Sequence, residues 1–380
     1  QNARTLVIES LYGLGGVGTW GQIAGYYYGY RLGFTAEIDA GVAALSGETK
    51  PAHRWNVEHK SEWLRRELRR AGADIWFGCL GIGAVMESNR VRGVVVATPE
   101  GPLVVRGRCV VDATGNADVA AAAGAPCVWS DEAEVAVQGT GLSPRSLSRS
   151  YINTDYTFVD DTDIVDIWRA FIVGRELFAE AWDLSRLIDT RERRRIVGEV
   201  EISPLDLYLG RTWRDTIALA QSNFDTHGYT VHSLFALRPP DRSSLTVPVP
   251  LRALLPRGVE HLLVIGLGIS AHRDALPVLR MQPDIQNQGY AAGVAAAWCA
   301  RDGRSPRALD VRALQQHLVQ QGIVPETALR DDDTPPVPDE RLDWAVRVLP
   351  EAWTGLEIVL SETNRALPRL RAAWAAASDE

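Results

Sequence analysis

The segment that decides the fold reads RCVVDATGNAD and spans residues 108–118. Its first half is a short apolar run typical of a buried strand, and Asp112 stands at the carboxyl end of that run. Thr114 and Gly115 follow at once, and glycine lets the backbone turn tightly where a Cβ atom would clash. An alanine-rich helix is expected from Val119 onward. The pattern therefore predicts a strand, a tight turn and a helix in immediate succession.

A second buried strand is predicted upstream, over residues 5–9, and it ends at Glu9. In dinucleotide-binding folds a carboxylate at such a strand end binds a ribose, about 20 residues beyond a glycine-rich phosphate loop. On this interpretation the phosphate loop would precede Gln1 and lie outside the printed sequence. The alternative is that Glu9 ends its strand without any ligand.

Residues 13–18 read GLGGVG and match the GxGxxG pattern literally. A phosphate loop of this kind requires a helix directly after Gly18, whose first N–H groups face the phosphates. The chain continues instead as TWGQIAGYYYG, and glycine at every fourth residue disfavours a helix. The sequence therefore favours another role for this loop, with the phosphate-loop interpretation as the alternative.

Further elements are predicted from the spacing of apolar residues and from turn residues. They are a helix over 58–71, a small antiparallel sheet over 73–111, helices over 162–182 and 191–197, a strand over 262–266, helices over 289–300 and 312–321, a linker over 331–336 and a helical tail over 340–376.

The composition excludes several classes of protein. The chain has 380 residues with 46% hydrophobic and 23% charged residues, and its net charge of −8 argues against a general nucleic-acid-binding protein. No apolar run reaches the roughly 18 residues of a membrane-spanning helix. The four cysteines lie far apart and form no CxxC pair, so neither a disulfide framework nor a zinc site is predicted. No export signal opens the printed sequence, and the cellular location stays unknown.

Several segments together resemble the FAD-dependent oxidoreductases that have the glutathione-reductase-like FAD fold. The similar segments occur in the family's order and cover roughly residues 1–325; they are residues 5–9, 14–19, 110–118, 247–256, 261–266, 269–272, 280–281 and 288–296. The resemblance implies an α/β protein, with an FAD-binding dinucleotide fold, an inserted cap domain and a helical C-terminal extension. It divides the chain into the first part of the FAD-binding domain (1–155), the cap or substrate domain (156–244), the second part of the FAD-binding domain (245–325), and a linker with the helical extension (326–380).

The resemblance also implies FAD as the cofactor and a set of cofactor-binding residues. These are Glu9, Gly15, Gly16, Thr19, Val85, Ala113, Thr114, Gly115, Asp118, Gly266, Gln288, Gly289 and Ala292. Asp118 has the alternative role of a negative charge at a helix N-terminus. A helix beginning at Gly289 would direct free N–H groups at the flavin, although its small residues also suit close packing. The family's own GxGxxG loop is absent from the printed sequence, so a second chain or fragment is expected to supply it.

Two residues are predicted to take part in the chemistry, because the resembling segment passes the flavin ring. His272 is expected to give or accept a proton near neutral pH, and Arg280 to bind a substrate carboxylate or other anion through two hydrogen bonds. The alternatives are a structural histidine and an ion-paired arginine. Asp225, His227 and His232 are further candidates in the segment expected to cover the flavin. No metal-ligand spacing is present.

The function implied by the resemblance is that of an FAD-dependent oxidoreductase, which transfers hydride between a small organic substrate and the flavin. One alternative is an NAD(P)-dependent dehydrogenase that uses residues 13–18. The other is a non-catalytic flavin-fold subunit of a larger complex. Neither nucleic acid nor a membrane span is expected.

Overall fold

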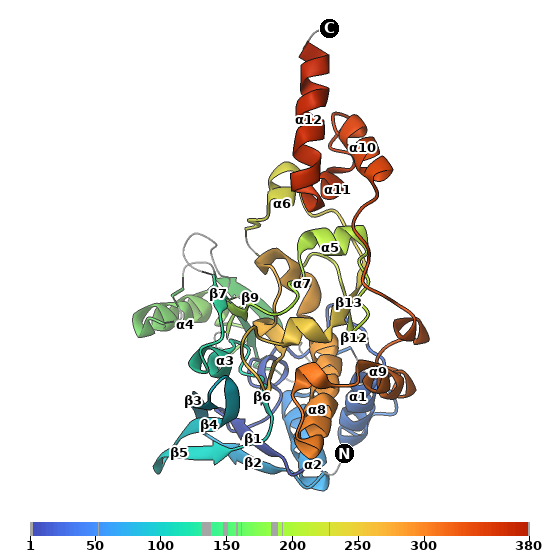
Figure 1. Cartoon of the computed structure of the whole chain (residues 1–380). Coiled ribbons are helices and arrows are strands. Elements are labelled where there is room, and N and C mark those ends of the chain that lie inside the picture. The colour runs from blue at the N-terminus through green and yellow to red at the C-terminus, as the bar shows by residue number, and fades with distance from the viewer. Residues whose placement is uncertain are drawn as a thin grey trace.

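The computed structural model describes residues 3–51, 53–130, 138–146, 151–156, 159–160, 162–183, 189–191, 193–227 and 229–378. Two pairs of parallel strands lead into the turns that the sequence predicts. β1 (Leu6–Glu9) pairs with β2 (Asp74–Phe77), and β6 (Val110–Asp112) pairs with β14 (Leu262–Val264). The strands predicted over 5–9, 108–113 and 262–266 are thereby confirmed. β1, β2 and β6 are labelled in Figure 1.

The two parallel pairs share a hydrophobic core but do not pair with each other. Ile8 of β1 and Val110 of β6 pack against the same core cluster, which includes Val264 of β14. Within the described residues, β1 pairs only with β2, and β6 pairs only with β14. One edge of β1 and one edge of β6 therefore have no strand partner in this part of the chain.

Two helices connect β1 to β2, as a parallel pair requires. They are α1 (Phe34–Leu45) and α2 (Val57–Arg70), and they pack through Ile38, Val42 and Trp63. The side chain of Asn56 caps α2 by accepting the N–H of His59. The crossover explains why residues 75–77 do not belong to the antiparallel sheet that the sequence predicted for them.

The predicted antiparallel sheet is confirmed for the rest of that region. β3 (Leu80–Glu87), β4 (Arg90–Thr98) and β5 (Gly101–Arg106) form a three-stranded meander. The short helix α3 (Asp118–Ala122) follows β6 and packs against β3.

The middle of the chain contains one clear error of the sequence prediction. Residues 191–197 were expected to form a helix, but β11 (Arg194–Ile196) pairs antiparallel with β7 (Cys127–Trp129). The Arg195 side chain is buried and donates to Ser130 Oγ at 2.8 Å, so tertiary pairing overrides the helical charge pattern. The other elements here are β8 (Gln138–Leu142), β9 (Ile152–Tyr156), β10 (Asp189–Thr190), α4 (Ile164–Phe178), α5 (Pro204–Leu209) and α6 (Ser233–Leu237).

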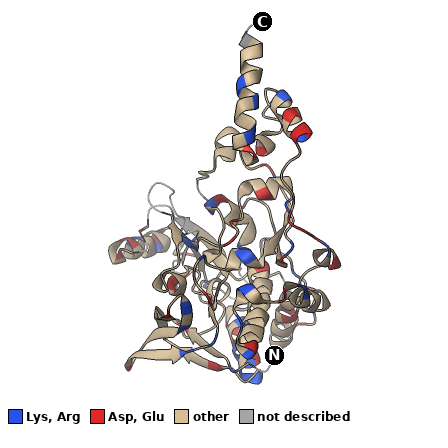
Figure 2. Ribbon diagram, in the orientation of Figure 1, with Lys and Arg blue, Asp and Glu red and all other residues tan. Residues whose placement is uncertain are grey.

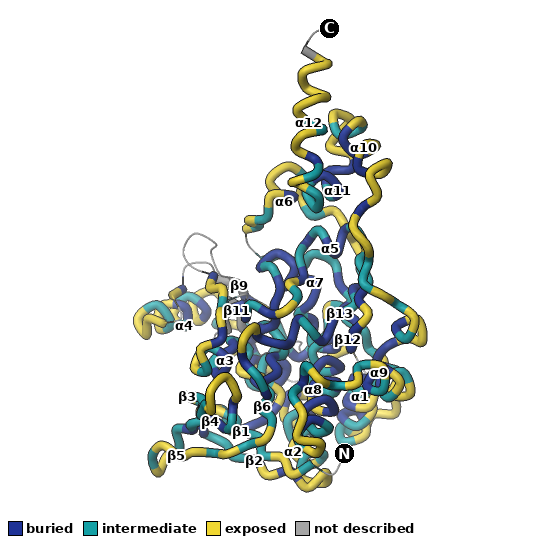
Figure 3. Tube along the Cα trace, viewed as in Figure 1, coloured by how far each residue is buried: buried dark blue, intermediate teal, exposed yellow. Residues whose placement is uncertain are grey.

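The largest hydrophobic core surrounds an antiparallel pair, β12 (Thr216–Ser222) and β13 (Leu245–Pro250). The helices α7 (Leu276–Leu279), α8 (Gln282–Asp302) and α9 (Val311–Gln320) contribute to it, and Figure 3 shows the buried segments gathered there. α8 begins at Gln282 rather than at Gly289, because Pro283 is favourable in a first turn. Gly303, with φ +66°, ends it.

The predicted helical tail consists of three helices, α10 (Asp339–Val348), α11 (Leu356–Ser361) and α12 (Thr363–Ser378). They enclose a separate small core, and α12 projects away from the rest of the chain (Figure 1). Figure 2 shows acidic and basic residues close together on α10 and α12, where Arg365 and Arg369 both pair with Asp339. In the part of the chain that the structure describes, no helix combines the length and the apolar character needed to cross a bilayer.

Candidate functional site

The first turn of the site follows β1. Glu9 ends the strand, and its Oε1 accepts the N–H of Leu11 at 2.9 Å. Gly15 and Gly16 have φ angles of +106° and +50°, and a Cβ atom on Gly16 would meet nothing within 4 Å. Thr19 is buried and donates from Oγ1 to the Leu14 carbonyl at 2.7 Å, which holds this loop together.

The loop lacks the helix that a phosphate loop requires. Residues 16–18 form a single turn of 3₁₀ helix, and residues 19–33, all of which the structure describes, contain no helix. A pyrophosphate loop needs a helix directly after Gly18, so that the helix N-terminus faces the phosphates. Because these residues have no such helix, the interpretation of residues 13–18 as a pyrophosphate loop is wrong.

The second turn follows β6 and is held by a buried carboxylate. Asp112 Oδ1 accepts the N–H and the hydroxyl of Thr114 at 3.1 and 2.7 Å, and Oδ2 accepts the N–H of Ala120 at 2.9 Å. Gly115 has a φ of +77°, and a Cβ atom there would meet nothing within 4 Å. Ala113 and Thr114 are exposed. Asp112 thus fixes a turn whose outer side is open.

Asp118 is the first residue of α3, and its side chain interacts with another residue of the protein. Its carboxylate forms an ion pair with Arg194, whose Nε also donates to the Asn116 carbonyl at 2.7 Å. The geometry matches the alternative role of a helix N-terminal charge. Val85 lies in the middle of β3, opposite Gly93.

The third turn follows β14 and contacts α8. Gly266 has a φ of +70°, and its N–H donates to Oε1 of the buried Gln288 at 2.6 Å. Because α8 begins at Gln282, Gly289 and Ala292 are helix-interior residues. The expectation that Gly289 supplies free N–H groups at a helix N-terminus is therefore wrong.

The structure brings His232 against His272, the first of the two predicted chemical residues. The two rings lie edge to face, with centroids 4.9 Å apart. Burial lowers the pKa of His272 to about 4, and its neighbour Asp274 opposes this only in part. His272 is therefore neutral near pH 7, contrary to the expectation that it titrates there. Burial also lowers the pKa of His232.

Arg280, the second predicted residue, is joined to Asp225 and His227. Its guanidinium donates to the Asp225 carbonyl at 2.7 Å and lies 3.4 Å from the Asp225 carboxylate. His227 Nε2 lies 3.1 Å from the other carboxylate oxygen. Burial alone would raise the pKa of Asp225, but the bond to His227 and the charge of Arg280 outweigh it and lower the pKa. The ion-paired alternative thus describes Arg280.

A buried acid at the start of α8 was not predicted. Asp284 is 3% exposed and accepts the N–H groups of Tyr30 and Gln221 at 2.7 and 2.9 Å. Burial raises its pKa to about 7. Asp284 therefore connects α8 to the loop that contains Tyr30 and to the end of β12. In the sequence, Asp284 is marked only as an acidic residue that follows a proline, a pattern typical of a helix start rather than of a buried acid.

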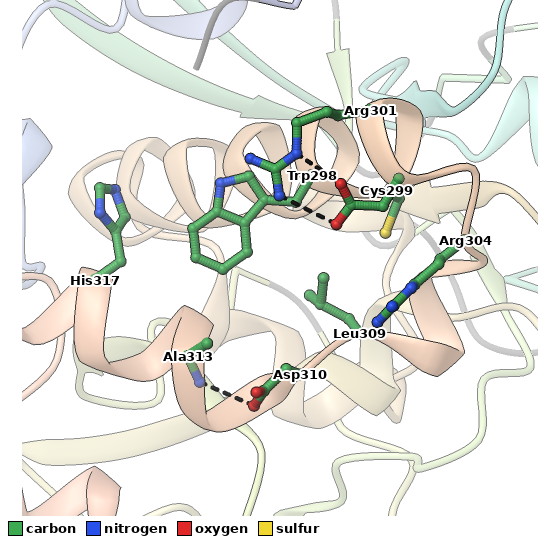
Figure 4. Close-up of a pocket in the computed structure, with 9 residues that line it drawn as sticks. Trp298, Cys299, Arg301, Arg304, Leu309, Asp310, Ala313 and His317 are labelled. Carbon is green, nitrogen blue, oxygen red and sulfur yellow. Dashed lines mark hydrogen bonds and ion pairs between the residues drawn. The ribbon is translucent and has the colours of Figure 1, made fainter.

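A cavity lies away from these residues. It has a volume of about 450 Å³ and lies between the C-terminal part of α8 and α9 (Figure 4). Trp298, Arg304 and His317 line it, and none of the predicted site residues does so. Among the described residues, no group of three His, Cys, Asp or Glu side chains is placed to bind a metal ion.

A family model described as FAD dependent oxidoreductase matches residues 1–186 and 168–318. The chain belongs to the FAD-dependent oxidoreductase family. FAD is the cofactor of this family, and the family model covers all three turns of the site.

Solved structures show a more distant likeness to this chain. THI4 from Thermovibrio ammonificans is 22% identical over 32% of this chain and 52% of its own, with a TM-score of 0.25. A geranylgeranyl bacteriochlorophyll reductase-like protein from Thermoplasma acidophilum is 10% identical over 86% and 76%, with a TM-score of 0.34. The anhydrotetracycline hydroxylase OxyS from Streptomyces rimosus is 15% identical over 87% and 70%, with a TM-score of 0.35. The chain thus spans about half the length of the THI4 structure. No curated protein matches the chain.

The turns fit a cofactor that approaches the backbone closely. Gly16 and Gly115 border open space on the side where a Cβ atom would lie, and both have positive φ. None of the described residues accepts a hydrogen bond from the N–H groups of Gly15 and Gly16. Open glycine backbone with free donors suits the polar groups of a dinucleotide.

Proposed function

We propose that this chain is an FAD-dependent oxidoreductase that transfers hydride between a small organic substrate and the flavin. The observation that carries the proposal is the family match over a chain in which β1, β6 and β14 each end in a glycine-containing turn. FAD, when bound, supplies the redox chemistry, and the protein supplies binding, orientation and electrostatics.

The residues that would hold FAD are those at the three turns and on α8. Glu9 would bind the ribose, because it ends a parallel strand as ribose-binding carboxylates do. The backbone at the turns and the adjoining face of α8 would contact the rest of the cofactor; these residues are Gly15, Gly16, Thr19, Ala113, Thr114, Gly115, Gly266, Gln288 and Ala292. We further propose that residues 1–155 and 245–325 form the FAD-binding domain, that residues 156–244 form the cap, and that residues 326–380 form the extension.

His272 would act as a hydrogen-bond donor rather than as a base. Its Nδ1 accepts the N–H of Asp274 at 3.1 Å, so the ring proton of the neutral form lies on Nε2. This Nε2–H can donate to a substrate oxygen or nitrogen. Arg280 would act through Asp225, since its guanidinium is committed to that residue.

The free strand edges support a further part of the proposal, that another segment supplies the phosphate-binding loop. Ile8 and Val110 belong to one core cluster, although their strands do not pair. A parallel strand added between β1 and β6 would join the two pairs into one sheet. The glycine-rich loop after such a strand would meet the turns at the carboxyl ends of its neighbours.

The absorption spectrum of the purified protein, with co-purifying chains retained, tests this function. We expect flavin bands that bleach when a reductant is added. If the protein is colourless and takes up no FAD even when an upstream segment is supplied, the proposal fails. An FAD-loaded protein that no small organic substrate or two-electron reductant can bleach would indicate the non-catalytic alternative.

A further inference from the structure

Lys60 is a buried lysine in α2, and the sequence contains only one other lysine, Lys50. Lys60 is 3% exposed, whereas Lys50 is exposed. It lies on the apolar stripe of α2, one turn from Val57 and Trp63, at a position where a hydrophobic residue would be expected. A buried lysine is costly unless its surroundings stabilise the charge, so this position calls for an explanation.

Aromatic rings, rather than a carboxylate, surround the Lys60 amine. Nζ lies 3.7 Å from the centroid of the Trp55 ring and 5.0 Å from that of the Tyr26 ring, and it donates to Tyr26 Oη at 3.4 Å. No described carboxylate forms an ion pair with Lys60. The Asp39 carboxylate instead accepts a hydrogen bond from the Tyr26 hydroxyl at 2.9 Å and forms an ion pair with Arg31. The amine is therefore held mainly by the negative faces of two rings.

The environment leaves Lys60 partly charged near neutral pH. Burial lowers its pKa to about 7, with Asp39 raising it and Arg31 lowering it further. Two more charged residues, Glu48 and Arg54, line a cavity of about 20 Å³ beside Lys60. That volume has room for about one water molecule.

Lys60 lies where the two proposed FAD-binding segments meet. Trp55 Nε1 donates to the Gly18 carbonyl at 2.7 Å. This hydrogen bond fixes the Trp55 ring against residues 13–18, which we call the glycine loop. A Cβ atom on Gly18 would lie 3.5 Å from Lys60 Nζ and 2.3 Å from Oε1 of Gln282, the first residue of α8. The amine is thus directly behind the glycine loop and next to the start of the helix that carries Gln288.

We propose that Lys60 is a positioning residue that holds a buried positive charge behind the glycine loop and thereby favours reduction of the bound FAD. The inference rests on the proposed function. A cation stabilises the negative charge that a flavin gains on reduction. For a separation of roughly 10 Å and an effective dielectric constant of about 20, Coulomb's law gives a change of about tenfold in such an equilibrium.

The test uses the FAD-loaded protein and two readouts of the electrostatic field. These are the reduction potential of the FAD and its affinity for sulfite, whose binding also places negative charge on the flavin. At pH 6 we expect K60M to lower the sulfite affinity about tenfold and to shift the potential to more negative values. The matched control K50M changes the other lysine, at an exposed site, and both readouts should stay at wild-type values. Equal values for wild type and FAD-loaded K60M would overturn the inference.

A second comparison keeps the test decisive if K60M does not fold. Arginine keeps its charge at pH 8.5, whereas Lys60 loses most of its proton between pH 6 and pH 8.5. The sulfite affinity of wild type, divided by that of K60R, should therefore fall over this range. A constant ratio would overturn the inference, and the ratio cancels the titration of sulfite itself.

The titration of Lys60 can be followed without FAD. With lysine labelled at its side-chain nitrogen or carbon, the protein gives only two lysine signals in NMR spectra. One should titrate near pH 7 and disappear in K60R. A Lys60 signal that titrates above pH 10 would contradict the buried, unpaired amine. Failure of the wild type to bind FAD even when a segment with the phosphate-binding loop is supplied would overturn the proposed function together with this inference. Unchanged readouts in FAD-loaded K60M would overturn the inference alone.

Discussion

The rings of His232 and His272 meet edge to face at 4.9 Å, and the Nδ1 atom of each ring accepts a backbone N–H. Asp274 lies at the base of this pair and accepts the N–H groups of Val231 and His232, each at 2.7 Å. The pair therefore joins the segment before α6 to the turn before α7. Both rings must be neutral, because a protonated Nδ1 cannot accept a hydrogen bond.

Acid should therefore weaken the fold through His272. Its pKa falls from 6.5 to about 4 on folding, so its contribution is complete above pH 6.5 and is lost as the pH falls toward 4. The full loss is at most about 3 kcal/mol. In the variant H272N the amide oxygen can still accept the Asp274 N–H, but nothing titrates. Urea unfolding at pH 7 and pH 5 should show a smaller loss of stability for H272N than for wild type; equal losses would contradict the assignment.

Replacing the buried carboxylate under the second turn should disturb both the fold and cofactor binding. Asp112 accepts three hydrogen bonds, and an amide in D112N would lose the charge and bring N–H groups against the same donors. We expect a loss of about 2 kcal/mol in the free energy of unfolding. FAD affinity should fall as well, because the Thr114–Gly115 turn would no longer be fixed. Urea unfolding and flavin fluorescence titration measure the two effects, and an unchanged unfolding curve would rule out this role.

A matched pair of glycine substitutions separates backbone strain from cofactor contact. Gly115 and Gly303 have similar φ angles, +77° and +66°, and a Cβ atom at either would meet nothing within 4 Å. Each change to alanine should cost about 1 kcal/mol of stability through the left-handed backbone alone. Only G115A should weaken FAD binding, because Gly303 ends α8 away from the three turns. Equal FAD affinities in the two variants would remove Gly115 from the site.

Arg280 should matter more for stability than a surface arginine does. In R280Q the partly buried Asp225 loses its bond to Arg280 and keeps His227 together with the charge of a second arginine, so we expect a loss of about 2 kcal/mol. The control R301Q breaks an exposed pair with Asp302 and should change stability by about 0.5 kcal/mol or less. Thermal unfolding of both variants checks this difference. If R280Q keeps its stability but has a raised KM for substrate, the result would instead support the prediction that Arg280 binds the substrate directly.

The predictions from sequence were most accurate where local pattern and tertiary environment agree. The apolar runs before Glu9, Asp112 and Gly266 are strands, because short continuous apolar segments are suited to burial on both faces. The run of arginines before Ile196 misled the prediction, since a helical charge pattern cannot reveal that Arg195 pairs with Val128, 67 residues away. Parallel pairing of residues 75–77 also depends on a distant strand, β1.

The site was predicted less completely than the fold. The glycine turns could be found because positive φ has a clear sequence preference. The contacts of His272 and Arg280 could not, since His232 and Asp225 reach them only through the fold. Lys60 was overlooked among many charged neighbours in α2, although its place between Val57 and Trp63 marks the buried face.

In the part of the chain that the structure describes, one edge of β1 and one edge of β6 lack a strand partner, and this has a practical consequence for work with this protein. A strand edge with unpaired N–H and C=O groups is a template for intermolecular pairing and hence for aggregation. Solubility on expression should therefore improve sharply when an extended peptide that completes the sheet is co-expressed. Comparing peptides of different register and apolar pattern in the same assay would test the proposal that another segment completes the sheet.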